Sequence, residues 1–395
     1  MNPPTKTILF INDEPAVGEF FCAQLTKLNP NWKATFVALP QQLLELTAKL
    51  HPDAVLADDY LPKMNGSSLL DEVRSRSPGS LRILMSSGIL NTSKLASAHQ
   101  YLAKPLELPQ VIEKLQQAFE AIETSRQYEG FDQIIGLPAF PALPVNLNRL
   151  LSLLNDRTDI TDAYKLLKQD ISMLTKLTQL ANSPLFGGAD LVPSEDAIAR
   201  LGVANVRSLV MSINVFKAYH KNASPLLGVQ DIWNQCQATA LLAQRLAFKA
   251  GLSEEANDAY FAGLVHKLGR LVLMDNHAPE YTELCRRSVE ENIPLTKLEY
   301  STFSVSHLEV SEFILNLWGL PANLTKVIGK HEHPWRGLRT PTPSLVTVLY
   351  LAEHFAQIRT DSRLPIEPLN QEYLQSCKAE SLISAAEALS TKESN

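Results

Sequence analysis

The spacing of hydrophobic residues divides the chain into two regions: one alternates between strand-like and helical patterns, and the other is helical throughout. Across residues 6–106, short apolar runs of strand length alternate with amphipathic stretches of helical spacing; the clearest runs are 8–11, 54–57 and 83–85. This alternation predicts βαβ units, in which parallel strands form one sheet that is covered by helices. The first region is therefore expected to be a doubly wound α/β domain.

Helical periodicity dominates the second region, from residue 137 to about 356, and strand signals are scarce there. One predicted helix face carries Leu167, Ile171, Leu174, Thr178 and Ala181. Such stripes predict an all-α helical bundle. The expected organisation is a first domain at 1–106, a linker helix at 107–130, a helical output domain at 131–356, and a tail at 357–395. That tail is polar and weakly patterned, which is typical of partial disorder or of one short terminal helix.

Composition narrows the classes of function. Of the 395 residues, 45% are hydrophobic and 20% are charged, as in an ordinary globular protein, and the net charge of -6 disfavours nucleic acid and anionic membrane as partners. No apolar stretch reaches the roughly 20 residues of a membrane span. The four cysteines are scattered, which disfavours a disulfide framework or a zinc ribbon and fits a reducing cytoplasm.

Four polar side chains follow the predicted strands of the first domain. Asp13 comes after the first strand, Asp58 after the third and Ser87 after the fourth, and Lys104 follows a fifth strand at 99–103. The carboxyl ends of parallel strands meet at one edge of a sheet, so these groups should converge. Two carboxylates can hold Mg²⁺ against a phosphoryl group that one of them accepts, while a lysine and a hydroxyl contact that group.

This arrangement resembles the receiver domain of response regulators over residues 6 to about 122, which implies a flavodoxin-like five-stranded sheet. The segment 58–66 places a proline four residues and a glycine eight residues after Asp58, and this spacing selects Asp58 over Asp59 as the phospho-acceptor. The resemblance implies Mg²⁺ held by Asp13, Asp58 and the backbone carbonyl of Tyr60. It also implies that Ser87, Tyr101 and Lys104 contact the phosphoryl group or switch with it.

Two features depart from the receiver pattern. The opening motif usually has two acids, and here Asn12 stands in place of the first, so Mg²⁺ binding is expected to be weakened. Only 17 positions separate Ser87 from Lys104, so the helix between them is expected to be short or irregular. A pseudo-receiver, which keeps the fold as a scaffold without phosphorylation, stays an alternative.

The second region resembles the HDOD family, a catalytically degenerate relative of HD-type metal phosphohydrolases. The matching motifs are Leu137-Pro138 with Leu143-Pro144, Asp170 leading into Leu180-Ala181-Asn182-Ser183, Ala197-Ile198 with Leu201-Gly202, the segment 262–269, and Trp318-Gly319-Leu320-Pro321. The resemblance implies a helical module that binds other proteins.

The metal site of an active HD enzyme is incomplete in this sequence. Such a site needs histidine and aspartate ligands that hold an ion and activate its water. Here the His-Asp pair reads His266-Lys267, and Gln235 stands where the first histidine is expected. We therefore expect no metal cofactor in this domain. The remaining histidines, His307 and His331, are expected to be a hydrogen-bonded core residue and a helix-terminal residue, with residual metal binding by His266, His307 and His331 as the alternative.

These observations favour a bacterial two-component response regulator that acts in a phosphorelay in the cytoplasm. Its expected partners are a sensor histidine kinase or phosphotransfer protein and a downstream protein, for which a cyclic-dinucleotide enzyme is one candidate; a homodimer is left open. The competing interpretations are an HD-type phosphodiesterase acting on cyclic dinucleotides, which Gln235 and Lys267 disfavour, and a transcription factor, which lacks a recognition motif here.

Overall fold

The structure is a computed structural model that describes residues 5–87, 97–138, 154, 158–183, 186, 190–218, 227–337, 340–360 and 362–391. The chain forms two compact units. The first comprises Met1–Asn146 with the short segments Phe303–Val305 and Phe313–Leu320, and the second comprises Leu147–Thr302, Ser306–Glu312 and Pro321–Asn395. Among the described residues, no helix combines the length and the apolar character needed to cross a membrane.

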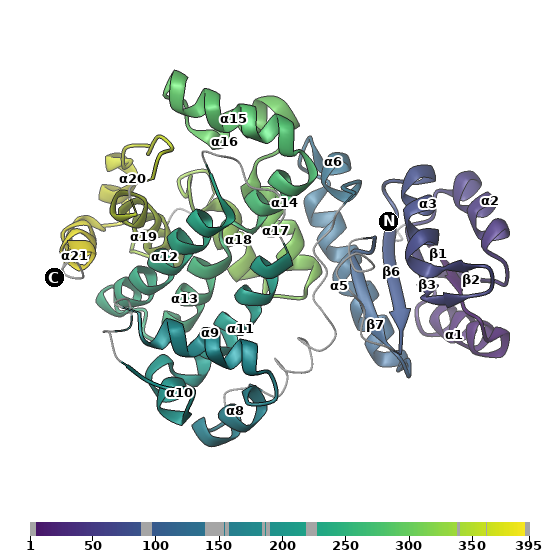
Figure 1. The fold of residues 1–395 in the computed structure, drawn as a ribbon. Coiled ribbons are helices and arrows are strands. Elements are labelled where there is room, and N and C mark those ends of the chain that lie inside the picture. Colours follow the sequence, from purple (N-terminus) through teal and green to yellow (C-terminus); the bar gives the residue numbers. More distant parts are fainter. Residues whose placement is uncertain are drawn as a thin grey trace. The chain divides into compact units, whose positions relative to one another are not determined.

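The first unit contains the predicted five-stranded parallel sheet, in the order β2-β1-β3-β6-β7 (Figure 1). Its strands are β1 (Lys6–Ile11), β2 (Trp32–Val37), β3 (Ala54–Asp58), β6 (Leu81–Ser86) and β7 (Gln100–Ala103), and a two-stranded ribbon is formed by β4 (Tyr60–Leu61) and β5 (Met64–Asn65). Its helices are α1 (Pro15–Leu28), α2 (Pro40–Leu50), α3 (Gly66–Arg76), α5 (Leu108–Ser125) and α6 (Phe131–Ile135). The predicted doubly wound fold is thereby confirmed.

Alternating side chains of the buried strands supply a core on each face of the sheet. Leu9 and Val55 pack with Leu43 of α2 and Leu69 of α3 on one face. Phe10, which points to the opposite face because side chains alternate along a strand, stacks on Phe21 of α1 at 6.0 Å between ring centroids. Helices α1 and α5 contact one another, as do α2 and α3, so each face of the sheet has its own helical layer.

One expected boundary is corrected by the structure. The helix expected as a linker, α5, belongs to the first unit: its Leu115 is buried, its Phe119 packs edge-on against Trp32 of β2, and its Glu123 pairs with Lys6 of β1 at 2.8 Å. In the tail, where partial disorder or one short terminal helix is expected, the described residues form α20 (Gln371–Ser376) and α21 (Glu380–Thr391). Helix α21 contacts α12 and α19, because its apolar face needs burial against other helices.

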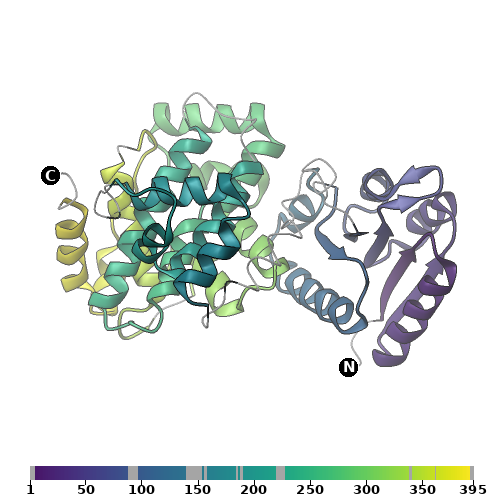
Figure 2. The ribbon, with the colours of Figure 1, turned by 60° about the horizontal axis from the view of Figure 1, so that its bottom comes forward.

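The regular elements in the described part of the second unit are helices, as the periodicity predicts (Figures 1 and 2). They are α8 (Ile160–Leu167), α9 (Ile171–Ala181), α10 (Glu195–Leu201), α11 (Val203–Ala218), α12 (Val229–Lys249), α13 (Ala256–Val265), α14 (Leu268–Asn276), α15 (Ala278–Glu291), α18 (Ala322–Lys330) and α19 (Leu345–Arg359), with all but the last residue of α16 (Leu295–Phe303) and the part of α17 (His307–Leu317) up to Glu312. Helix α12 packs along α13 and α19 and forms the centre of the bundle. The motif Leu143-Pro144 and the expected helix at 88–96 lie outside the described residues.

Candidate functional site

The phospho-acceptor predicted from the sequence lies at the carboxyl edge of the first sheet. Asp58 ends β3 and its side chain is fully buried. Gly66, the first residue of α3, is required here because a Cβ at this position would lie 2.1 Å from the carbonyl oxygen of Asp58. The glycine eight residues after the aspartate therefore allows α3 to begin directly against the end of β3.

The residues expected around Asp58 converge on its carboxylate. The Lys104 ammonium, which follows β7, forms an ion pair with Oδ2 of Asp58 and lies 3.6 Å from Oδ1 of Asp13. The side-chain amide of Asn12 donates to Oδ2 of Asp58 at 3.1 Å, and the backbone amide of Tyr60 donates to Oδ1 at 3.2 Å. Burial raises the pKa of the Asp58 carboxyl, although Lys104 and the Tyr60 amide oppose that shift. The edge thus gathers an acceptor, a cation and a second carboxylate.

The two expected switch residues differ in their surroundings. Ser87 directly follows β6 and is exposed. The hydroxyl of Tyr101 lies inside the unit and donates to the carbonyl oxygen of Ser86 at 2.9 Å, so its ring is held close to the end of β6. Burial raises the pKa of this hydroxyl, which keeps it a hydrogen-bond donor at neutral pH. Both hydroxyls therefore neighbour the strand whose end faces Asp58.

The second unit holds a buried cluster of charged side chains where the HD-like motif occurs. Gly269 is the second residue of α14, and a Cβ there would lie 2.1 Å from the carbonyl oxygen of His307, the first residue of α17. The glycine thus lets α14 approach α17 closely. This close approach brings together His266 and Lys267, from the turn between α13 and α14, and His307; all three side chains are fully buried.

Lys267 is the central cation of this cluster. Its ammonium donates to Oε1 of Glu332 at 2.9 Å and forms a second ion pair with Oε1 of Glu353 on α19. Arg270 of α14 adds its guanidinium at 3.6 Å from Oε1 of Glu332. Burial would raise the pKa of both carboxyls, but Lys267 and the neighbouring histidines hold them well below their usual range.

His307 is fully buried and bridges two carboxylates. Its Nδ1 lies 2.7 Å from Oε2 of Glu299 and its Nε2 lies 3.1 Å from Oε1 of Glu332. Burial alone would lower the pKa of His307, and the two carboxylates raise it. The hydroxyl of Tyr281 and the guanidinium of Arg270 also approach Glu299. Three carboxylates, Glu299, Glu332 and Glu353, thus face the cations Lys267 and Arg270 together with the His307 ring.

Three of the cluster's side chains could offer ligand atoms to a metal ion. Ligand atoms of His266, His331 and Glu353, all buried, lie within 4.8 Å of one another. The expected residual set was His266, His307 and His331, so Glu353 replaces His307. The fit is poor while Lys267 is present, because a carboxylate oxygen that binds its ammonium is not free to hold a divalent ion. The ligand atoms thus lie near one another, but the adjacent Lys267 ammonium opposes the binding of a metal ion.

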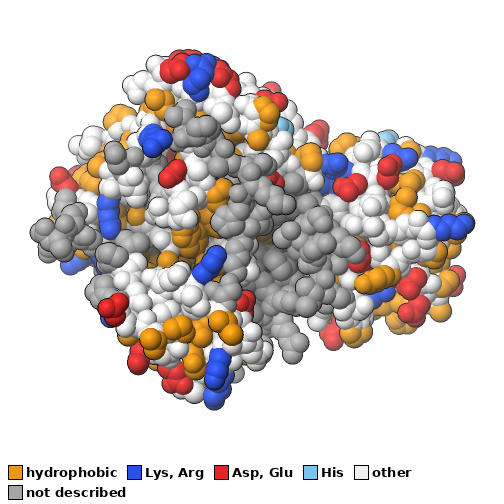
Figure 3. Space-filling view, in the orientation of Figure 1, with side chains coloured by type: hydrophobic (Ala, Val, Ile, Leu, Met, Phe, Trp, Pro, Cys, Tyr) orange, Lys and Arg blue, Asp and Glu red, His pale blue; other side chains and the backbone are white. Residues whose placement is uncertain are grey.

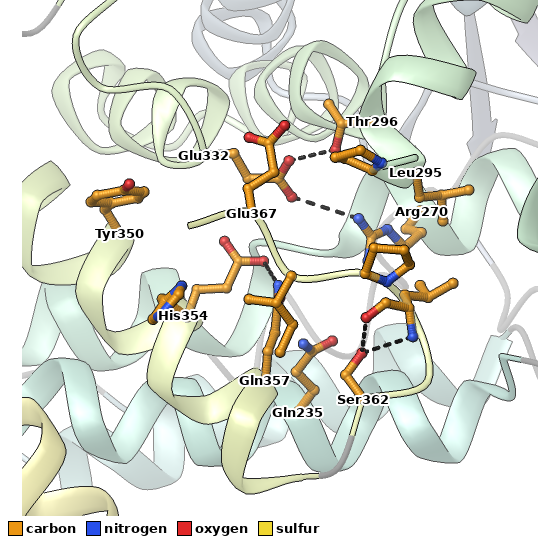
Figure 4. Close-up of a pocket in the computed structure, with 15 residues that line it drawn as sticks. Gln235, Arg270, Leu295, Thr296, Glu332, Tyr350, His354, Gln357, Ser362 and Glu367 are labelled. Carbon is orange, nitrogen blue, oxygen red and sulfur yellow. Dashed lines mark hydrogen bonds and ion pairs between the residues drawn. The ribbon is translucent and has the colours of Figure 1, made fainter. Parts of the chain in front are cut away.

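The cluster opens toward a small pocket of about 60 Å³. Figure 4 shows Glu332, Arg270 and Thr296 among the residues that line it. The side-chain amide of Gln357 donates to Oε1 of Glu353 at 2.8 Å. Gln235, the residue in place of the expected histidine, lines the same pocket from α12. Sequence reasoning named His266, Lys267, His307, His331 and Gln235. It missed the acids Glu299, Glu332 and Glu353; Glu299 and Glu353 lie within the helices α16 and α19, and Glu332 lies in the turn after α18.

Known families match both units. A family model described as the HDOD domain matches residues 137–334, and one described as the response regulator receiver domain matches residues 8–116. An uncharacterized protein of Treponema pallidum is 25% identical over 220 residues, covering 55% of this chain and 42% of the relative. Transcriptional regulatory protein MalR of Bacillus subtilis is 28% identical over 104 residues, covering 25% of this chain and 44% of that protein. The chain thus spans less than half the length of these curated relatives.

A solved structure supports the helical fold. The crystal structure of an HDOD domain protein with unknown function from Geobacter sulfurreducens has a TM-score of 0.52 and 23% identity, and it covers 70% of this chain and 89% of its own. At this identity the likeness shows the fold alone. The HDOD model itself spans half of the chain, and the receiver model accounts for the sheet ahead of it. The chain therefore belongs to the HDOD family, as a response regulator with an N-terminal receiver domain.

Proposed function

We propose that Asp58 accepts a phosphoryl group from a sensor histidine kinase or phosphotransfer protein, and that the HDOD domain then signals by binding a protein partner in the cytoplasm, without hydrolysis. The observation that carries the proposal is the buried Asp58 carboxylate, which faces the Lys104 ammonium with Asp13 alongside. This is the set of groups that a phosphoryl transfer to an aspartate requires.

Each residue of the edge has a separate part in that transfer. Asp13, Asp58 and the Tyr60 carbonyl would hold Mg²⁺, which when bound neutralises the transferring oxygens. Asp58 attacks the phosphorus, and the bond from phosphorus to the donor nitrogen breaks as the acyl phosphate forms. Lys104 then exchanges its ion pair with Asp58 for one with the phosphoryl oxygens. Ser87 and Tyr101 follow the new charge and shift the receiver between two conformations.

The ion pairs of the HDOD cluster support binding over hydrolysis. A hydrolytic ion would have to displace Lys267, which is fully buried and pairs with two carboxylates. On the face drawn in Figure 3, basic and acidic side chains of the described residues are intermixed. Such a surface favours a protein partner over nucleic acid, whose recognition needs a concentrated basic patch. A cyclic-dinucleotide enzyme is one candidate for that partner.

A metal-dependent phosphodiesterase is the second candidate function, since His266, His331 and Glu353 keep ligand atoms near one another. It requires a bound ion in the wild-type chain. A pseudo-receiver scaffold is the third, since Asn12 replaces an acid at the edge. It requires that Asp58 carry no phosphoryl group in function.

The test compares partner capture by the full chain in three states: wild type with Mg²⁺, wild type with Mg²⁺ and beryllofluoride, and Asp58→Asn with both. Beryllofluoride stands in for the phosphoryl group on Asp58. The proposal predicts that at least one partner is gained or lost in the second state alone. Equal capture in all three states would contradict it and favour the scaffold.

A further inference from the structure

A second cavity of the HDOD domain lies between three helices. Its volume is about 260 Å³, and the described residues that line it come from α9, α11 and the amino-terminal end of α12. Helices α9 and α11 contact one another (Figure 1). The cavity shares no described lining residue with the pocket beside the charge cluster. Its size, just below the about 300–1,000 Å³ of drug-sized ligand sites, suits a small molecule.

The buried side of this cavity is apolar. Ile213 and Phe216 lie three residues apart on α11 and are buried, as is Val229 at the start of α12. The Phe216 ring meets the ring of half-buried Trp233 edge-on, with 4.8 Å between the ring centroids. Such a pair of aromatic rings is favourable in itself, so each ring holds the other in position. A ligand for this cavity therefore needs an apolar body.

The polar groups that line the cavity include a cation, Lys176 of α9. Lys176 is half-buried, and its ammonium makes no ion pair with the residues that the structure describes. Within the same part of the chain, the indole N–H of Trp233 makes no hydrogen bond. The described lining residues include no Asp or Glu that could balance the ammonium. The cavity thus places an unpaired positive charge next to an apolar surface.

The amino-terminal end of α12 adds to this positive character. Backbone amides in the first turn of a helix lack partners within the helix, and they carry a partial positive charge. Val229 and Gln230, the first two residues of α12, line the cavity. The acid of that turn, Asp231, accepts a hydrogen bond from the Gly228 amide at 2.9 Å and lines a different cavity. A bound anion is therefore favoured here.

We propose that this cavity binds a small organic monocarboxylate, with its apolar body against Phe216 and Trp233 and its carboxylate next to Lys176. Lys176 disfavours an amine of the same shape. The apolar side disfavours a nucleotide, whose phosphates would lose water there without gaining partners. The site is independent of Asp58 and of the buried charge cluster, so it gives the HDOD domain a chemical input beyond the proposed function.

The test uses three probes that share a phenylpropyl body and differ in charge: 3-phenylpropionate, 3-phenylpropanol and 3-phenylpropylamine. Ligand-observed NMR gives the Kd of each for the tag-free full chain. Lys176→Met removes the charge and keeps an unbranched side chain on a half-buried position, so the fold should be preserved. The matched control is Lys165→Met, which removes an exposed lysine of α8 that pairs with Asp162 at 3.1 Å.

We expect the wild type to bind 3-phenylpropionate with a Kd of about 1 mM or below. The carboxylate should bind about threefold more tightly than the alcohol, as for a partly exposed ion pair, and the amine should bind least. Lys176→Met should lose this preference and keep its affinity for the alcohol, whereas Lys165→Met should keep both. A preference that persists in Lys176→Met overturns the proposal, and so does a wild type that binds none of the probes.

A second measurement locates the bound probe without a substitution in the protein under test. The chain has four tryptophans, so the ¹⁵N-labelled protein gives four indole N–H signals. The signal of Trp233 is the one missing from Trp233→Phe. It should shift on titration with 3-phenylpropionate and give the same Kd, while Trp32, Trp318 and Trp335 serve as internal controls. A Trp233 signal that does not move at saturation places the probe elsewhere and overturns the proposal.

Discussion

Each unit of the chain pairs a lysine with a buried carboxylate, and the two pairs differ in access to solvent. In the receiver, Lys104 pairs with Asp58 while its own side chain is 22% exposed and neighbouring Asp13 is 42% exposed. In the HDOD domain, Lys267 is 0% exposed and its partner Glu353 only 4%. The first pair can therefore exchange partners with an incoming ion or phosphoryl group, whereas the second is enclosed. A lysine–carboxylate pair can thus act as a switch in the receiver and as part of an enclosed charge network in the HDOD domain.

The largest effect should come from a change in the solvent-accessible pair, Lys104–Asp58, and should appear as a loss of phosphorylation. Asp58→Asn should abolish labelling by a small phosphodonor such as acetyl phosphate in Mg²⁺, because the amide oxygen cannot form the acyl phosphate. Intact-mass spectrometry of the labelled chain measures this directly. Asp59→Asn, the matched control at the adjacent buried acid, should retain labelling; loss in Asp59→Asn alone would reassign the acceptor.

Removing the enclosed lysine should cost more stability than removing an exposed one. Lys267→Met leaves the buried Glu353 and the half-buried Glu332 without their shared cation and should lower the free energy of unfolding by about 3–5 kcal/mol. Lys165→Met, which breaks an exposed pair with Asp162 at 3.1 Å, should cost about 1 kcal/mol or less. Urea unfolding followed by circular dichroism measures both. Equal losses would remove the distinction between the enclosed and the exposed pairs.

A third substitution tests Mg²⁺ binding at the carboxyl edge of the receiver sheet. Asn12→Asp adds a carboxylate next to Asp58 and should tighten Mg²⁺ binding by about tenfold, which is about 1.4 kcal/mol. Isothermal titration calorimetry with Mg²⁺ provides the measurement. An unchanged affinity would mean that the substituted acid lies too far from the ion to matter.

The smallest effect concerns a buried histidine of the receiver unit. Burial, together with the charge of Arg82, holds the pKa of His99 well below 6.5. Nδ1 of His99 accepts from the Arg82 amide at 2.9 Å, and Nε2 faces the carbonyl oxygen of Ile135. Below about pH 6.5 the unfolded chain binds a proton that the folded chain excludes, so stability falls as pH decreases.

That loss should not exceed about 1.4 kcal/mol per pH unit for this one group. His99→Gln keeps one acceptor and one donor without titrating, so its unfolding free energy should decline less between pH 6.5 and 5. Chemical denaturation at several pH values compares the two proteins. Parallel pH profiles would show that His99 is not the source of the slope.

The sequence predicted the receiver better than the HDOD cluster, for a physical reason. Parallel strands are short apolar runs, and their carboxyl ends converge, so Asp13, Asp58 and Lys104 could be placed together from their positions alone. In a helical bundle, by contrast, the partners of a buried charge come from helices distant in sequence. Glu353 lies 86 positions from Lys267, within an otherwise apolar helix, and no local pattern connects the two.

Helix α5 shows a second limit of sequence reasoning. Its apolar stripe of Val111, Leu115, Ala118 and Ile122 correctly predicted an amphipathic helix whose stripe is buried. Amphipathicity does not say which surface covers that stripe, so a linker and a receiver helix looked alike. The contacts of Phe119 with Trp32 and of Glu123 with Lys6 assign the helix to the receiver.

The central claim, signalling by the HDOD domain without hydrolysis, is tested most directly by turnover. The full chain, with and without beryllofluoride, is incubated with cyclic dinucleotides and Mn²⁺, and products are separated by chromatography beside a His331→Ala control. The account predicts no product above that control in either state. Product formation by the wild type that disappears in His331→Ala would contradict it and identify a working metal centre.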